Sequence, residues 1–213
     1  MDLLQRIEQT KIVAILRGID PDRMLKTAHA LYDGGIRLIE VTFDQKSRDF
    51  EKTASAIKAL CTEFGSSMDV GAGTVTSTAL VRLAADSGAG FIISPDTNVD
   101  VIRMTKSLGL VSMPGAMTPS EIIQAHEAGA DFVKVFPAGV LGPDYIKAVR
   151  GPISNVRLLA VGGVDESNIA AFLKAGCVGA GVGGSLAKKE CIDAQQYDKL
   201  KEAAIRLLSA MRG

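Results

Sequence analysis

The stretch Phe132-Val133-Lys134-Val135-Phe136 is a short, β-rich apolar run of the kind that forms a buried strand. A helix-like segment precedes it, and Gly129 lies between the two, as expected where a helix ends in a left-handed residue. That helix-like segment opens with Thr118-Pro119-Ser120-Glu121, which places a capping residue before a proline at the first helical position. The stretch is therefore one unit of a helix–strand alternation.

The same unit recurs along the chain. Predicted strands lie at 12–17, 37–42, 69–73, 90–94, 110–114, 132–136, 157–161 and 178–182. Predicted helices lie at 22–33, 48–63, 76–87, 98–107, 119–128, 143–149 and 166–175, with a leading helix at 2–10 and a closing helix at 195–211. This alternation predicts an α/β protein with a parallel sheet, closed as a (β/α)8 TIM barrel. An open doubly wound sheet is the alternative. No linker interrupts the series, so we expect residues 1–213 to form a single domain.

The composition excludes several classes of protein. The chain has 24 basic and 24 acidic side chains, so its formal net charge of zero gives no indication of nucleic-acid or anionic-membrane binding. Its cysteines, Cys61, Cys177 and Cys191, form no disulfide framework or zinc pattern. No apolar run reaches the roughly 18 residues of a membrane helix, and no signal-peptide core leads the chain. We therefore expect a cytoplasmic protein.

Lys134 is a charged side chain in the middle of a predicted buried strand, on the same face as Phe132 and Phe136. A charge there is costly, because both faces of a parallel strand are buried. The residue could protect an edge strand or form a buried salt bridge, but a closed barrel has no edge. Burial lowers the pKa of a lysine, and a neutral amine can attack a ketone to form an imine. We therefore favour a functional role for Lys134.

Glu40 is a second charge in a predicted strand, within Leu38-Ile39-Glu40-Val41-Thr42. It could be the ionic partner of Lys134 or of Arg17, which is compatible with a catalytic role. A carboxyl group in a partly apolar cavity has a raised pKa and can exchange protons near neutrality. Arg17 ends the first predicted strand, at the face where barrels hold their sites, and its guanidinium suits a substrate carboxylate. A surface arginine is the alternative.

Glycine-rich turns follow the last two predicted strands, at Gly162-Gly163 and Gly183-Gly184-Ser185. Barrels commonly bind phosphate with these two loops, through backbone N–H groups, a helix N-terminus and here the Ser185 hydroxyl. Tight turns also require glycine, which is the alternative. Gly71-Ala72-Gly73-Thr74 ends the third predicted strand, where small residues let a ligand approach the backbone and Thr74 offers a hydroxyl. Tight helix–strand packing would require the same small residues.

The remaining polar candidates carry less information. His29 and His126 fall in predicted outer helices, and no histidine–carboxylate cluster suggests a metal. We interpret Lys188 and Lys189 as solvated surface residues. An imine mechanism needs no metal, so we expect no cofactor.

Several motifs together resemble one family from end to end. They are Ala14-Ile15-Leu16-Arg17-Gly18-Ile19, Ile39-Glu40-Val41-Thr42, Gly71-Ala72-Gly73-Thr74-Val75, Ile93-Ser94-Pro95, Pro114-Gly115, Lys134-Val135-Phe136-Pro137-Ala138, Gly162-Gly163 and Gly183-Gly184-Ser185. In this order the chain resembles the KDPG aldolases, the 2-keto-3-deoxy-6-phosphogluconate / 4-hydroxy-2-oxoglutarate aldolases. The resemblance implies a homotrimeric, metal-free (β/α)8 barrel that forms a pyruvyl imine.

The resemblance also implies roles for individual residues. Lys134 would form the imine, and Glu40 would be the general acid/base. Thr74 would lie near the pyruvyl carboxylate, and Pro95 and Phe136 would line the pocket. The two glycine turns would bind the phosphate.

Three positions depart from the pattern of the gluconate enzymes. Asp44 stands where they usually carry an arginine for the carboxylate; the galactonate-specific relatives also lack it and rely on the first-strand arginine, a role that Arg17 fits. Val161 stands where a threonine influences stereochemistry at C4, and the galactonate relatives have valine there. Asp96 follows Ile-Ser-Pro in place of glycine, and with Asp44 it would add negative charge near an anionic ligand.

These observations predict a class I aldolase, a carbon–carbon lyase. The predicted reaction is cleavage of 2-keto-3-deoxy-6-phosphogluconate to pyruvate and glyceraldehyde 3-phosphate, with 4-hydroxy-2-oxoglutarate as a further candidate substrate. The 6-phosphogalactonate version is one alternative, favoured by Arg17 and Val161. A non-catalytic phosphosugar-binding barrel is another, suggested by Asp44 and Asp96. Another phosphate-binding barrel enzyme, such as an isomerase, ranks last because it has no use for a buried imine-forming lysine.

Overall fold

The computed structural model describes residues 2–212, so the ends of the expected domain, residues 1 and 213, lie outside the described residues. Within them, parallel strands form one sheet in the order β5-β4-β3-β2-β1-β9-β8-β7-β6. The strands are β1 (Ile12–Leu16), β2 (Leu38–Thr42), β3 (Asp69–Gly73), β4 (Phe91–Ile93), β5 (Val111–Met113), β6 (Gly115–Ala116), β7 (Val133–Val135), β8 (Leu158–Val161) and β9 (Gly179–Val182).

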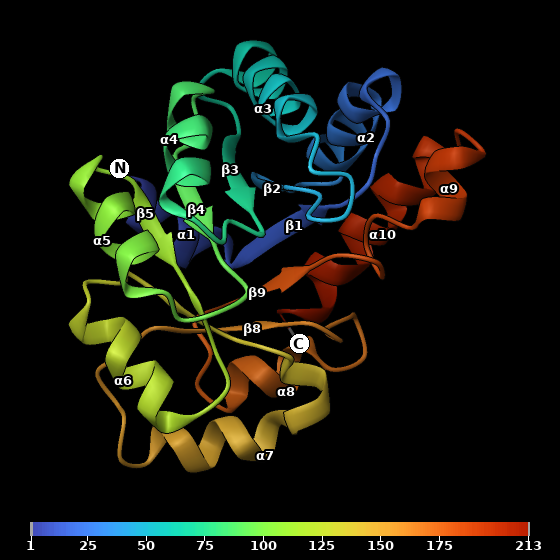
Figure 1. Cartoon of the computed structure of the whole chain (residues 1–213). Helices are drawn as coiled ribbons and strands as arrows, with labels where there is room; N and C mark the ends of the chain where they lie inside the picture. Colours follow the sequence, from blue (N-terminus) through green and yellow to red (C-terminus); the bar gives the residue numbers. More distant parts are fainter. Residues whose placement is uncertain (1, 213) are drawn as a thin grey trace.

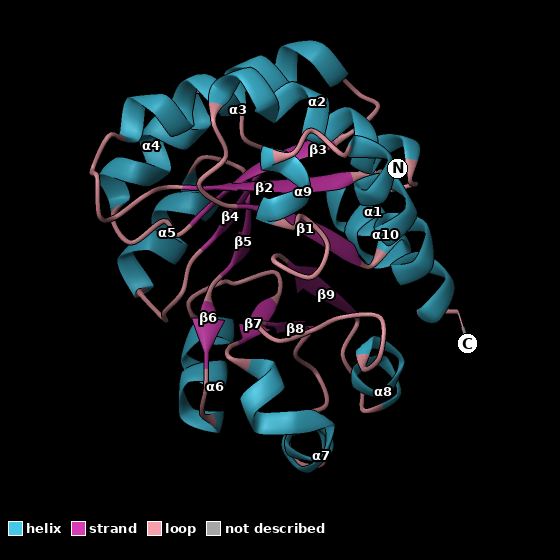
Figure 2. Ribbon diagram, turned by 90° about the vertical axis from the view of Figure 1, so that its right-hand side faces the viewer, coloured by secondary structure: helices cyan, strands magenta, loops and turns pink. Residues whose placement is uncertain are grey.

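Two of these strands occupy a single position in the sheet. β5 pairs with β4, and β6 pairs with β7, while only Pro114 separates β5 from β6 along the chain. The predicted strand at 110–114 corresponds to β5, whereas β6 lies beyond Pro114 and was not predicted; Pro114 interrupts the ladder because a proline offers no N–H. The two pieces join the ends of the sheet and close it into a barrel, with helices around the outside (Figure 1; Figure 2). The prediction of a (β/α)8 barrel is confirmed.

The helices lie close to their predicted positions. They are α1 (Leu3–Thr10), α2 (Pro21–Asp33), α3 (Phe50–Phe64), α4 (Thr78–Asp86), α5 (Val99–Ser107), α6 (Pro119–Glu127), α7 (Ala138–Arg150), α8 (Ile169–Lys174), α9 (Lys189–Asp193) and α10 (Tyr197–Ala210). Thr118 caps α6 in a reciprocal capping box with Glu121, as its sequence predicts. α7 begins earlier than predicted and continues across a kink at Gly142. The Gly142-Pro143 pair resembles the start of a helix in sequence, which is why the first turn was not predicted.

The buried side chains form two layers. An outer layer between strands and helices includes Val133 and Val135, whereas an inner layer inside the barrel includes Phe132, Leu38 and Leu159. Alternate residues of one strand therefore point to opposite sides of the sheet, as predicted for 132–136. The inner layer packs the interior of the barrel, and barrels of this kind hold their sites at the carboxyl-terminal face.

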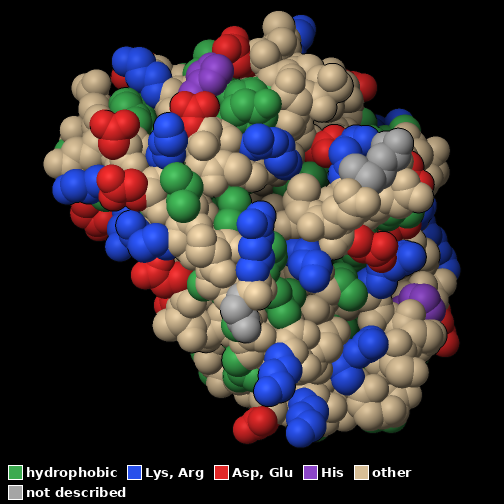
Figure 3. Space-filling view, turned by 180° about the vertical axis from the view of Figure 1, so that it is seen from behind, with side chains coloured by type: hydrophobic (Ala, Val, Ile, Leu, Met, Phe, Trp, Pro, Cys, Tyr) green, Lys and Arg blue, Asp and Glu red, His purple; other side chains and the backbone are tan. Residues whose placement is uncertain are grey.

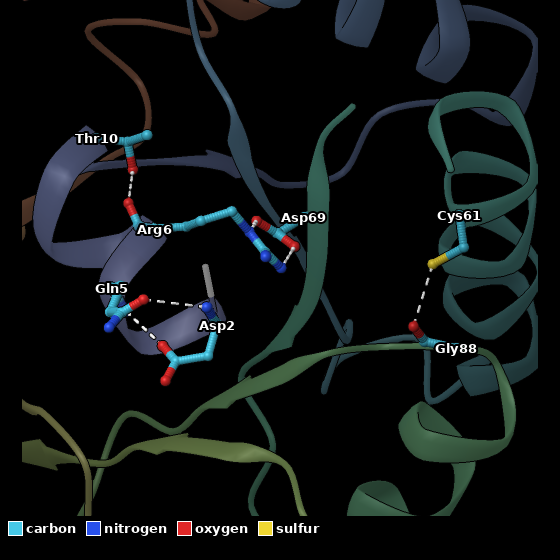
Figure 4. A network of polar contacts seen from close by, with 7 residues as sticks. All are labelled: Asp2, Gln5, Arg6, Thr10, Cys61, Asp69 and Gly88. Carbon is cyan, nitrogen blue, oxygen red and sulfur yellow. Dashed lines mark hydrogen bonds and ion pairs between the residues drawn. The ribbon is translucent and has the colours of Figure 1, made fainter. Parts of the chain in front are cut away.

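Helix α1 closes the amino-terminal end of the barrel. Its Ile7 is buried in the inner layer, and Arg6 donates two hydrogen bonds, of 2.7 and 2.6 Å, to the carboxylate of Asp69 at the start of β3. Figure 4 shows this paired contact together with the capping of α1 by Asp2, which exchanges hydrogen bonds with Gln5. A bidentate arginine–carboxylate pair fixes geometry better than a single contact. Helix α1 thus covers one end of the barrel, and the end at which the strands terminate is left for a ligand.

Truncation of Phe132 is expected to destabilise the fold. Its ring is fully buried in the inner layer, two residues before Lys134, so Phe132→Ala should cost about 3–5 kcal/mol of the free energy of unfolding. Chemical denaturation measures this loss. Leu108→Ala, at a side chain that is 40 % exposed, is the control and should change stability by less than about 0.5 kcal/mol. Equal effects of the two substitutions would contradict the inner layer described above.

Basic and acidic side chains are interspersed on the face seen in Figure 3, which agrees with the balanced composition. Among residues 2–212, no helix has the length and apolar character needed to cross a bilayer. The same residues contain no group of three or more His, Cys, Asp or Glu side chains placed to hold a metal ion.

Candidate active site

A cavity of about 590 Å³ opens at the carboxyl-terminal ends of the strands. Most of the predicted site residues line it: Arg17, Glu40, Lys134, Phe136, Val161, Gly162, Gly163, Gly183, Gly184 and Ser185. Thr74 and Pro95 are not among its lining residues. The strands that contribute are β1, β2, β7, β8 and β9, so parts of the chain far apart in sequence meet here because parallel strands end at one face of the barrel.

Lys134 lies in the middle of β7 and is only 7 % exposed. Its Nζ atom is 4.7 Å from the centre of the Phe136 ring, whose π face attracts a cation. Burial lowers the pKa of the Lys134 ammonium, and the negative charge of Glu40 opposes that shift. The nearby charge of Arg17 lowers the same pKa further. The net effect is a lowered pKa, which increases the neutral fraction of the Lys134 amine relative to an exposed lysine.

Glu40 lies in the middle of β2, opposite Ile15 of β1, and is 2 % exposed. Burial raises the pKa of its carboxyl group, while the positive charges of Lys134 and Arg17 oppose the shift. Its Oε2 atom is buried and has no hydrogen-bond partner among the described residues. No hydrogen bond or ion pair joins Glu40 to Lys134 in the described part of the chain. The two groups share a cavity, and a structural salt bridge does not account for either of them.

Arg17 follows β1 and is exposed at the mouth of the cavity. Its charge acts on both Lys134 and Glu40, so it lies on the same side of the site as the two buried groups. Asp44 faces elsewhere: its carboxylate accepts a hydrogen bond of 2.8 Å from the Lys46 N–H and lines a separate hollow beside α2 and α3. Asp96 remains close enough to raise the pKa of Lys134. Of the two acids that depart from the family pattern, only Asp96 influences the site.

The two glycine turns lie next to one another at the rim. Gly162 and Gly163 have φ values of 86° and 77°, which side chains rarely adopt. Gly139 of α7 packs directly on this turn and donates its N–H to the Gly162 carbonyl at 2.7 Å. The N–H groups of Gly163, Gly184 and Ser185 form no hydrogen bond with another described residue. Unpaired N–H groups on two adjacent turns are donors available to an anion.

The Ser185 hydroxyl has a partner within the rim. It donates a hydrogen bond of 3.0 Å to the Val164 carbonyl and so links the two turns. In this arrangement it holds the rim together, and its backbone N–H is the group left for a ligand.

Thr74 directly follows β3, and Pro95 lies two residues after the end of β4. Thr74 has a φ of 57°, a left-handed conformation that is unfavourable for a β-branched residue. Its carbonyl accepts a hydrogen bond of 3.0 Å from the Gln45 side chain, which connects it to the loop after β2. Backbone strain of this kind is characteristic of functional positions, but the motif in the sequence gives no sign of it.

Sequence reasoning missed several lining residues. These are Ile15, Val164, Asp165, Gly181, Ala187, Lys189 and Glu190. Strand alternation would have indicated Ile15, since it lies two residues after the inner-layer Val13. Lys189 is exposed, as expected, yet it reaches the rim because the short α9 turns back over the cavity mouth and pairs it with Asp193 at 2.6 Å.

The chain forms a closed (β/α)8 barrel, with a buried amine and a buried carboxyl group at its carboxyl-terminal end. Together with the family match, these features identify an aldolase, and aldolases are carbon–carbon lyases. The chain belongs to the class I KDPG and KHG aldolase family, whose model matches residues 3–203. The family resemblance of the sequence is thereby confirmed.

Individual relatives support the assignment. The chain is 35 % identical over 207 residues to the 2-dehydro-3-deoxy-6-phosphogalactonate aldolase of Escherichia coli K12, covering 96 % of this chain and 97 % of the relative. It is 30 % identical over 206 residues to the 2-dehydro-3-deoxy-phosphogluconate aldolase of Pseudoalteromonas atlantica, covering 96 % and 93 %. A solved structure described as native KDPGal matches with a TM-score of 0.85 and 35 % identity over 94 % of each chain.

Proposed function

We propose that this aldolase cleaves 2-keto-3-deoxy-6-phosphogalactonate to pyruvate and glyceraldehyde 3-phosphate through an imine on Lys134. The observation that carries the proposal is that Lys134 and Glu40 are buried in one cavity with no hydrogen bond or ion pair between them among the described residues. Two glycine turns with N–H groups that lack a partner within the described chain lie beside them. The cavity volume of about 590 Å³ suits a small phosphorylated acid.

The proposed chemistry assigns a step to each group. The neutral Nζ of Lys134 attacks the C2 ketone, and loss of water gives the imine. Glu40 takes the proton of the C4 hydroxyl, directly or through a water, and the electrons of the C3–C4 bond move into the imine as glyceraldehyde 3-phosphate leaves. The carboxyl group then returns a proton to C3 of the enamine. Hydrolysis of the resulting pyruvyl imine releases pyruvate and restores the amine.

The substrate is held at two ends in this proposal. Arg17 binds the carboxylate next to the reacting ketone, as a guanidinium does through paired hydrogen bonds. The N–H groups of Gly163, Gly184 and Ser185 bind the phosphate at the other end of the cavity. Asp44 does not oppose either contact, because its carboxylate is turned toward its own loop.

The galactonate epimer takes precedence over the gluconate epimer for three reasons. Val161 and Arg17 both line the cavity, and each is the residue associated with the galactonate enzymes. The relative named for the galactonate substrate is 35 % identical, and the one named for the gluconate substrate is 30 % identical. The gluconate epimer is the substrate predicted from the sequence. It remains the second candidate because the Pseudoalteromonas atlantica gluconate enzyme aligns over 96 % of this chain.

Cleavage of the two C4 epimers tests the proposal. Pyruvate release, measured with a coupled dehydrogenase, should have a higher kcat/KM for the galactonate epimer. Val161→Thr should shift the ratio of the two kcat/KM values toward the gluconate epimer by about tenfold, which corresponds to the net contribution of one added hydrogen bond. Val164→Thr, also at the cavity wall, is the matched control and should leave the ratio unchanged. Binding of both epimers without pyruvate release would instead support the non-catalytic barrel.

The proposal includes a cytoplasmic homotrimer. The trimer follows from the family resemblance of the sequence, and the cytoplasmic location from three cysteines that are free in the structure. Sedimentation equilibrium of the purified chain tests the oligomeric state.

A further inference from the structure

We infer that Gly73 is a positioning residue for Glu40: the carboxylate occupies the space that a side chain at Gly73 would fill. The inference rests on the proposed function, because it concerns the proton transfer assigned to Glu40. It gives the Gly-Ala-Gly-Thr motif a role that neither ligand approach nor helix–strand packing describes.

The inner face of β3 explains how this space arises. Gly71 and Gly73 occupy the inner-facing positions of β3, because Val70 and Ala72, which alternate with them, pack in the outer layer. Glu40 of β2 lies opposite Gly71 in the ladder, and Thr42 lies opposite Gly73. The Glu40 side chain therefore reaches along the strand direction to cover Gly73.

The fit leaves no room for a methyl group. A Cβ atom built on Gly73 would overlap the Glu40 Oε1 and Cδ atoms and would lie 2.6 Å from Cγ. Real Cβ atoms do not approach that closely, so a side chain at residue 73 would move the Glu40 carboxylate away from the position that it has here. The other carboxylate oxygen, Oε2, remains without a partner, as a group that exchanges protons with a ligand requires.

The backbone does not demand glycine at this position. Gly73 is not among the residues with positive φ, so alanine can adopt its conformation without strain. Gly71 provides a contrast within the same strand, because a Cβ there would overlap the ring of Phe91 and not Glu40. Phe91 belongs to the inner layer, so Gly71 serves packing and Gly73 serves the carboxylate.

Gly73→Ala should separate the two chemical steps. Lys134 lies on β7, far from β3 in the sheet order, so imine formation with pyruvate and trapping by borohydride should persist. Proton transfer should fail, because the methyl group displaces the base. Exchange of the pyruvate methyl protons in D2O, followed by NMR, should fall by about 10²- to 10⁴-fold, the usual contribution of a positioned acid/base. Wild-type exchange in Gly73→Ala would overturn the inference.

A double-mutant cycle distinguishes positioning from general damage. If Gly73 acts through Glu40, adding Gly73→Ala to Glu40→Gln should change the exchange rate little, because the base is already lost. Gly71→Ala is the matched control, since its clash is with Phe91, and its effect should multiply with that of Glu40→Gln. Multiplication of the Gly73→Ala and Glu40→Gln effects would contradict the inference.

A stability cycle applies if Gly73→Ala alone does not fold. Glu40→Ala removes the group that competes for the space, so the double variant Gly73→Ala/Glu40→Ala should fold with a melting temperature near that of Glu40→Ala. A double variant that also fails to fold would overturn the inference. This readout needs no substrate. If the wild type traps no pyruvate at Lys134, the proposed function fails. The stability cycle still tests whether Glu40 and a side chain at residue 73 compete for the same space.

Discussion

Lys134→Met is expected to abolish cleavage while the barrel remains folded. Loss of a covalent nucleophile lowers turnover on the order of 10⁴- to 10⁶-fold, because the remaining contacts bind the substrate but open no imine pathway. Methionine has a similar length and suits the apolar surroundings of Phe136 and the inner layer. Steady-state pyruvate release, with circular dichroism to verify the fold, measures the effect.

The control for this substitution is Lys174→Met, at an exposed lysine of α8 outside the cavity. It should cleave the substrate at the wild-type rate. Substantial activity in Lys134→Met, with the fold intact, would show that another amine or a different mechanism performs the reaction.

Glu40→Gln is expected to lower cleavage by about 10²- to 10⁴-fold, the range found for a general acid/base, without preventing imine formation. Glutamine preserves the shape of the side chain but accepts no proton at physiological pH. Glu40→Gln should therefore still trap pyruvate at Lys134 with borohydride. Loss of trapping along with cleavage would show that Glu40 is needed for imine formation and not only for proton transfer.

The pKa shifts predict different pH profiles for the wild type and for Glu40→Gln. Burial lowers the pKa of Lys134, so the rate of trapping should rise with pH and reach its plateau below the pH expected of an ordinary lysine. The Glu40 charge raises that pKa, so Glu40→Gln should move the trapping profile to lower pH. Burial raises the pKa of Glu40, and the base must be ionised, so the acid limb of kcat/KM should lie above that of an ordinary carboxyl group and disappear in Glu40→Gln. A trapping profile in Glu40→Gln that moves to higher pH would contradict the placement of the two charges.

Much of the fold could be predicted because parallel barrels leave simple marks in a sequence. Strands buried on both faces are continuous apolar runs, and helices that turn back into them end in glycine. Two pieces that were not predicted adjoin prolines. They are β6, which follows Pro114, and the first turn of α7, which precedes Gly142-Pro143; a proline marks an interruption without telling whether an element continues on its other side.

The candidate site was predictable where chemistry conflicts with burial. Lys134 and Glu40 are conspicuous because charges are costly in barrel strands. The direction in which a side chain points at the rim leaves no such conflict in the sequence. The Asp44 carboxylate accepts a hydrogen bond from its own loop, and the Ser185 hydroxyl donates one to the carbonyl of Val164. Both directions depend on how the loops fold. The space beside Gly73 likewise depends on the register of β2 against β3, which no single stretch of sequence contains.

The central claim is that Lys134 is the amine that binds pyruvate. Incubation of the protein with pyruvate and borohydride, followed by proteolysis and mass mapping, tests it most directly. We predict one stable reduced adduct, on the peptide that contains Lys134. An adduct on a different lysine, or no adduct on the folded protein, would contradict the account.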